Sequence, residues 1–135
     1  PKLLEERKRV FNTYTQAFEN CNWAIVPPSI EGDKESSYHI YALRIKDFTE
    51  EQRDRMIDEI AKSEVAVNVH FIPMPMLSFF NSLGYDIKDY PQAYENFKGE
   101  ISLPIYPQLD EEKLAFIIDT VKAAYRKVAG DKIVE

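Results

Sequence analysis

Cysteine, histidine and glycine are scarce in this sequence of 135 residues. A single cysteine, Cys21, excludes an intrachain disulfide, and two distant histidines with one thiol give no metal-ligand spacing. The four glycines lie too far apart to build a loop that cradles a phosphate group. We therefore expect no disulfide framework, no metal site and no glycine-rich nucleotide loop.

Long apolar runs and basic clusters are missing as well. No apolar stretch approaches the roughly 18 residues of a membrane span, and the charged start of the chain does not resemble a secretion signal. The formal net charge is −6 and the basic residues are dispersed, whereas binding to a nucleic-acid backbone needs positive patches. The sequence therefore predicts a cytoplasmic protein with no membrane and no nucleic-acid partner.

The residues that are present suit one folded unit with a hydrophobic core. Hydrophobic residues make up 44% of the chain, which is typical of globular proteins, and its length is about that of one domain. We predict a single domain over residues 1–135, cut from a longer protein because the chain begins at Pro1 and enters a helical pattern at once.

Hydrophobic periodicity predicts amphipathic helices and short strands. Helices are expected over residues 2–20, 49–62, 91–97 and 110–130, and strands over residues 23–26, 37–46, 65–71 and 100–103. This order indicates an α+β fold in which a small, mainly antiparallel sheet is covered by helices, with residues 37–46 as the longest strand. The first helix carries Phe11, Tyr14 and Phe18 on its apolar face, and we expect part of that face to stay uncovered.

His70 and Phe71 are the candidate site residues. They come at the end of the strand predicted from Val65, and Pro73 and Pro75 follow them directly, so the chain must leave the sheet there. Strand ends and the loops after them often carry binding sites. From the residues alone, a structural role for His70 is favoured over a ligand contact, and His39, in the middle of a predicted strand, favours a structural role still more.

Several short motifs occur in a set order along the chain. They are Ser37-Tyr38-His39-Ile40-Tyr41 with Arg44, Arg53-Asp54, Val69-His70-Phe71-Ile72-Pro73, Leu83-Gly84-Tyr85, Tyr90-Pro91-Gln92-Ala93 and Ile101-Ser102-Leu103-Pro104-Ile105-Tyr106-Pro107. Together they resemble the C-terminal domain of the pyridoxal-phosphate-dependent sugar aminotransferases of the DegT family. The resemblance covers about residues 3–125.

The resemblance implies the small domain of a fold type I enzyme that depends on pyridoxal phosphate (PLP). Such enzymes transfer an amino group, typically from glutamate, to a nucleotide-linked keto-sugar, and they act as homodimers. In that family the Schiff-base lysine and most PLP contacts belong to a larger N-terminal domain. We therefore expect no catalytic, cofactor-binding or metal-binding residue in this chain, and no activity of the chain alone; residues 2–20 would connect the two domains.

By the same resemblance, His70 and Phe71 match a His-Tyr or His-Phe pair beside the sugar-nucleotide cleft, and are expected to bind substrate. The family often continues with a second histidine, where this chain has Met74 and Met76. The alternative is a stand-alone α+β module for binding or dimerisation, without catalysis. The sugar, the nucleotide and the aminated position stay open, as does a family variant that replaces the lysine with histidine and dehydrates sugars.

Overall fold

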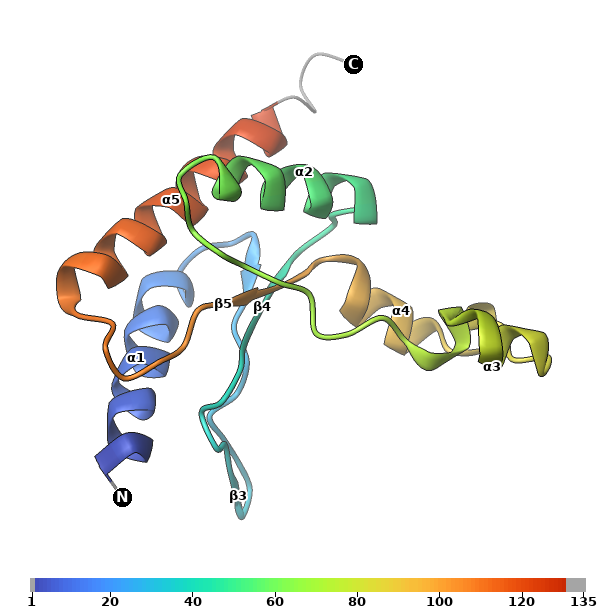
Figure 1. Ribbon diagram of the computed structural model, residues 1–135, viewed down its shortest axis with the longest axis horizontal. Helices are drawn as coiled ribbons and strands as arrows, with labels where there is room; N and C mark the ends of the chain where they lie inside the picture. Colours follow the sequence, from blue (N-terminus) through green and yellow to red (C-terminus); the bar gives the residue numbers. More distant parts are fainter. Residues whose placement is uncertain (1, 131–135) are drawn as a thin grey trace.

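The computed structural model describes residues 2–130 as a small sheet with helices packed around it and a separate projecting part (Figure 1). The elements in chain order are α1 (Lys2–Phe18), β1 (Ala24–Ile25), β2 (Ile30–Glu31), β3 (Lys34–Glu35), β4 (Tyr41–Ile45), α2 (Glu50–Ala61), η1 (Met74–Met76), α3 (Ser78–Ser82), η2 (Ile87–Asp89), α4 (Pro91–Lys98), β5 (Glu100–Leu103) and α5 (Glu111–Gly130). The predicted α+β class is confirmed.

The main sheet has the strand order β1-β4-β5, and both pairings are antiparallel, as predicted. β4 is the longest strand, but it is shorter than the predicted residues 37–46. Tyr38 has a left-handed backbone, with φ 53°, and this conformation keeps the residues before Tyr41 out of the sheet. Within β4 the alternation holds, because Tyr41, Leu43 and Ile45 are buried and the residues between them are partly exposed.

The strand predicted over residues 65–71 is wrong. Only Asn68 pairs with the sheet, through a single antiparallel bridge to Ser102. The N–H of His70, which would make the next ladder bond, donates instead to Glu100 Oε2 at 2.9 Å. The ladder therefore does not continue along β5.

The expectation that part of the apolar face of the first helix stays uncovered is wrong for its aromatic residues. Phe11, Tyr14 and Phe18 are all buried, and only apolar residues near the start of α1, such as Leu3, are exposed. Phe11 meets the ring of Tyr41 edge-on with centroids 4.8 Å apart, and the Tyr14 hydroxyl donates to the carbonyl of Pro104 at 2.8 Å. The aromatic face of α1 is therefore part of the domain's own core.

Helices α2 and α5 begin where the sequence predicts. Thr49 and Gln52 form a capping box at the start of α2, with bonds of 3.1 and 3.2 Å, and Asp110 accepts from the N–H of Lys113 at 2.8 Å in the first turn of α5. The predicted end of the last helix at Gly130 coincides with the last described residue. α2 and α5 pack on each other beside the sheet (Figure 1).

Residues 71–96, which we call the arm, project from the sheet on the right of Figure 1. The arm holds η1, α3, η2 and most of α4, and these short elements pack mainly on one another. It exposes a set of large apolar side chains: Phe71, Ile72, Met74, Phe79, Leu83, Tyr85 and Tyr90. His70 lies at the point where the chain passes from the sheet into the arm.

Candidate functional site

The predicted pair His70 and Phe71 lies at the root of the arm, and both side chains are accessible. His70 is exposed, and Phe71 is 69% exposed. Truncation of Phe71 would destabilise the fold only if its ring were buried, and the structure places the ring outside the core. Neither side chain is used to build the core, so both are free to contact another molecule.

A buried carboxylate lies behind His70. Glu100 is 5% exposed; its Oε2 accepts from the His70 N–H, and its Oε1 accepts from the hydroxyl of Ser102, which is also buried. Burial raises the pKa of the Glu100 carboxyl, while the hydrogen bonds from Ser102 and His70 act in the opposite direction. The main chain at His70 is therefore tied to a polar group inside the domain.

A groove of about 410 Å³ brings both histidines of the chain together. Its lining residues come from three places: the segment before β4, the segment around Asn68 that bridges to Ser102, and β5 with the residues after it. They are His39, Ile40, Ala66, Val67, Asn68, His70, Ser102, Leu103, Pro104 and Ile105. Two imidazoles can donate and accept hydrogen bonds. The groove therefore suits a polar ligand.

His39 lines the groove, although the sequence predicts a structural role for it in the middle of a strand. A strand over residues 37–46 would place it in mid-strand, but β4 starts only at Tyr41 and His39 is exposed ahead of it. The left-handed backbone at Tyr38, which nothing in the local sequence indicates, directs the chain there. Phe71 does not line the groove. The side chain that shares the groove with His70 is therefore His39 and not its sequence neighbour Phe71.

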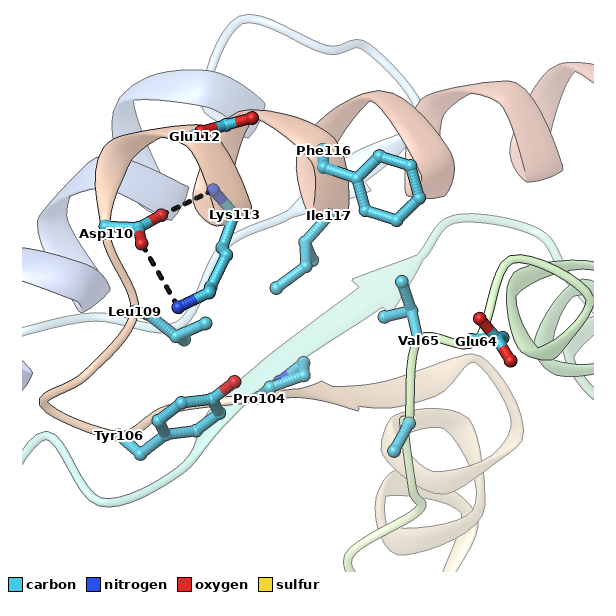
Figure 2. Close-up of a pocket in the computed structure, with 11 residues that line it drawn as sticks. Glu64, Val65, Pro104, Tyr106, Leu109, Asp110, Glu112, Lys113, Phe116 and Ile117 are labelled. Atoms are coloured by element: carbon cyan, nitrogen blue, oxygen red, sulfur yellow. Dashed lines mark hydrogen bonds and ion pairs between the residues drawn. The ribbon is translucent and has the colours of Figure 1, made fainter.

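A larger pocket of about 630 Å³ opens next to the groove, and Ala66 and Pro104 line both hollows. Figure 2 shows its walls: the start of α5 with Phe116 and Ile117 on one side, and the chain around Tyr106 and Val65 on the other. Its lysine, Lys113, pairs through Nζ with Asp110 at 3.1 Å, and its main-chain N–H donates to the same carboxylate, as the dashed lines in Figure 2 indicate. The pocket is mainly apolar and holds no histidine or cysteine.

The lysines of residues 2–130 lack the surroundings of a Schiff-base lysine. A Schiff-base lysine needs a desolvated position that lowers its pKa. Between residues 2 and 130 every lysine is exposed or partly exposed, and Lys8, Lys62, Lys98, Lys113 and Lys127 pair with carboxylates. In the same part of the chain no group of three or more His, Cys, Asp or Glu side chains could hold a metal ion.

Comparison with known proteins identifies the family. The sequence model of the DegT/DnrJ/EryC1/StrS aminotransferase family matches residues 1–122. The chain belongs to this family. The resemblance seen in the sequence motifs is thereby confirmed, and the aminotransferase family accounts for the small antiparallel sheet with its covering helices. No helix described within the family domain is long and apolar enough to cross a membrane.

Relatives of this DegT-family chain include proteins named as sugar aminotransferases. The chain is 31% identical over 122 residues to MJ1066 of Methanocaldococcus jannaschii, an uncharacterised protein. This match covers 89% of the present chain and 31% of the relative. It is 29% identical over 126 residues to the UDP-4-amino-4,6-dideoxy-N-acetyl-beta-L-altrosamine transaminase of Campylobacter jejuni, covering 93% of this chain and 33% of that enzyme.

Solved structures agree with this assignment. Spr1654 of Streptococcus pneumoniae, named as a sugar aminotransferase, superposes in its apo form with a TM-score of 0.92 at 35% identity. The match covers 98% of this chain and 33% of that chain. The same protein is known in a PLP form and a PMP form, each with a TM-score of 0.90. The chain thus spans about a third of the length of the relatives it matches.

Proposed function

We propose that this chain is the C-terminal domain of a PLP-dependent aminotransferase that transfers an amino group, from glutamate, to a nucleotide-linked keto-sugar. The observation that carries the proposal is the groove with His70 and His39 on a domain of the DegT family. A UDP-linked amino sugar in the name of the Campylobacter jejuni relative supports this substrate class. PLP would carry the amino group, held by the part of the enzyme outside this chain.

In this proposal the chain forms one wall of the substrate cleft. The exposed imidazole of His70 donates a hydrogen bond to the sugar nucleotide, and His39 on the same groove offers a second polar contact. Phe71 lies outside the groove and supplies an apolar contact beside it. The enzyme would work as a cytoplasmic homodimer, and the apolar side chains of the arm supply surface that an assembled enzyme can cover.

The test uses the full-length protein and a UDP-linked amino sugar as the probe. His70→Ala should weaken binding of the probe several-fold up to about tenfold, because one hydrogen bond contributes on the order of 0.5 to 1.5 kcal/mol. The absorbance of the bound cofactor should not change. Gln16→Ala, an exposed polar residue on α1, is the matched control and should leave binding unchanged. If His70→Ala lowers the melting temperature but not affinity, His70 is structural.

A second test separates an enzyme domain from a stand-alone module. The chain alone, incubated with PLP and then borohydride, should give no stoichiometric, site-specific pyridoxyl adduct, since it offers no buried lysine among residues 2–130. A specific adduct would contradict the proposed division of the enzyme. The alternative is a binding or dimerisation module without catalysis. It predicts that the gene encodes no upstream domain with a buried lysine after a strand. Sequencing the gene upstream of Pro1 decides between the enzyme domain and the module.

A further inference from the structure

The side-chain carboxylate of Glu100 accepts a hydrogen bond from the His70 N–H that a main-chain carbonyl would accept in a regular sheet. Asn68 and Ser102 exchange two main-chain hydrogen bonds, of 2.7 and 3.2 Å, across the bridge. Because such pairs recur at every second residue in an antiparallel ladder, the next pair would be His70 and Glu100. The His70 N–H instead donates to the Glu100 side chain at 2.9 Å.

The main-chain carbonyl of Glu100 is occupied from elsewhere. It accepts a hydrogen bond from Arg53 Nη1 at 3.4 Å, and the same nitrogen donates to the carbonyl of Phe97 at 2.9 Å. The main-chain hydrogen bond described for His70 therefore reaches β5 through the Glu100 carboxylate and not through its carbonyl. That carboxylate is fixed in turn by the Ser102 hydroxyl and by burial.

We propose that Glu100 is a positioning residue for His70: its buried carboxylate holds the His70 N–H, stops the ladder and fixes the imidazole at the edge of the groove. This inference rests on the proposed substrate-side role of His70. Burial of a carboxylate is costly unless it is well hydrogen-bonded. Both oxygens of the buried Glu100 carboxylate accept hydrogen bonds, one from Ser102 and one from the His70 N–H, which a residue needed only for packing would not require.

Two substitutions at Glu100 separate positioning from packing. Glu100→Gln keeps an oxygen that can accept from His70 and an amide that can donate to the Ser102 hydroxyl. Glu100→Leu keeps a similar volume but removes the acceptor, so the His70 N–H and the buried Ser102 hydroxyl lose their partner and the melting temperature should fall modestly. The two variants therefore differ in whether residue 100 can accept from the His70 N–H, and they differ little in side-chain volume.

The experiment measures hydrogen–deuterium exchange of residues 66–73 in the full-length protein. Glu100→Leu should raise the exchange rate of this segment several-fold and weaken binding of the UDP-linked amino sugar several-fold, while Glu100→Gln should match the natural protein in both. Equal exchange in Glu100→Leu and the natural protein, or equal losses in the Leu and Gln variants, would overturn the proposal. If Glu100→Leu does not fold, Glu100→Asp carries the test, because its shorter side chain withdraws the carboxylate and should raise exchange.

Exchange needs no ligand, so the outcome does not depend on the proposed function. If Glu100→Leu frees the segment while His70→Ala leaves probe binding unchanged, the positioning role stands and the substrate role of His70 fails. If His70→Ala weakens binding but Glu100→Leu changes nothing, the proposed function stands and the role of Glu100 fails.

Discussion

The guanidinium of Arg53 donates to the carbonyl of Phe97 at 2.9 Å and lies over the ring of the same residue, 4.8 Å from its centroid. Arg53 comes from α2, and Phe97 lies near the end of α4, between the arm and β5. The side chain of Arg53 is 3% exposed, and its Nε also pairs with Asp54 at 2.6 Å. Its Nη1 also reaches the carbonyl of Glu100, so one buried cation joins α2, the end of α4 and the start of β5.

Arg53→Ala should lower the free energy of unfolding by about 3 kcal/mol, because hydrogen bonds from a charged group and the packing of its stem are lost together. Urea unfolding of the full-length protein measures this change. Arg126→Ala, an exposed arginine on α5, is the control and should stay within about 0.5 kcal/mol. Equal effects of the two substitutions would show that the contacts of Arg53 contribute little.

Gly99→Ala should also destabilise the protein, by about 1 to 3 kcal/mol. A Cβ at this position would lie 2.5 Å from the main-chain oxygen of Ile45, and the N–H of Ile45 donates to the Gly99 carbonyl at 2.8 Å. The added methyl group must therefore push β5 away from β4. Gly130→Ala, in a helix with nothing within 4 Å of the new Cβ, should be neutral or stabilise by up to about 1 kcal/mol. Thermal melts of both variants test the contrast.

Stability should fall at high pH because of buried tyrosines. Burial raises the pKa of Tyr41 to about 12 and raises the pKa of Tyr14 as well. Above pH 10 the unfolded chain loses these protons while the folded protein keeps them, so each tyrosine removes about 1.4 kcal/mol of stability per pH unit up to its folded pKa. Below pH 10 the two groups have no such effect.

Tyr41→Phe isolates this contribution. The variant loses only a 3.3 Å contact with the Thr15 hydroxyl, which costs at most about 1 kcal/mol at pH 8. Between pH 10 and pH 11 its free energy of unfolding should fall less steeply than that of the natural protein, by about 1 kcal/mol. Urea unfolding at the three pH values measures the difference, and parallel curves would contradict the assignment.

Phe71→Ala should leave the fold intact and affect binding. A buried phenylalanine would cost about 3 to 5 kcal/mol when truncated, but the Phe71 ring is 69% exposed, so the change in unfolding free energy should stay within about 0.5 kcal/mol. Affinity of the full-length protein for the UDP-linked amino sugar should fall. Phe97→Ala, which removes a buried ring at the base of the arm, is the matched control and should lower the melting temperature.

Local signals in the sequence were sufficient for much of the fold. The capping box at Thr49, the cap at Asp110 and the alternation within Tyr41–Ile45 each depend on residues a few positions apart, and the structure confirms them. The antiparallel sheet and its longest strand follow from those signals. The family motifs likewise named the class of enzyme domain that the comparisons support.

The errors concern residues whose conformation depends on distant partners. The segment from Val65 has strand-like composition, but the N–H of His70 meets a carboxylate that lies 30 positions later in the chain. The burial of Phe11 depends on Tyr41, and no pattern within the first helix indicates that contact. His39 was set aside because the left-handed backbone at Tyr38 cannot be read from its neighbours. The substrate role of His70 and Phe71 stays a prediction.

The arm leaves the sheet at His70 and returns through Gly99 to Glu100, so its two ends meet at one point of β5. Its tip, around α3 and η2, packs mainly within the arm and does not pair with the strands of the sheet. Insertions or deletions there would leave the β4–β5 alignment and the place of His70 unchanged. A change in the length or sequence of the arm can therefore alter the surface next to the groove without moving His70.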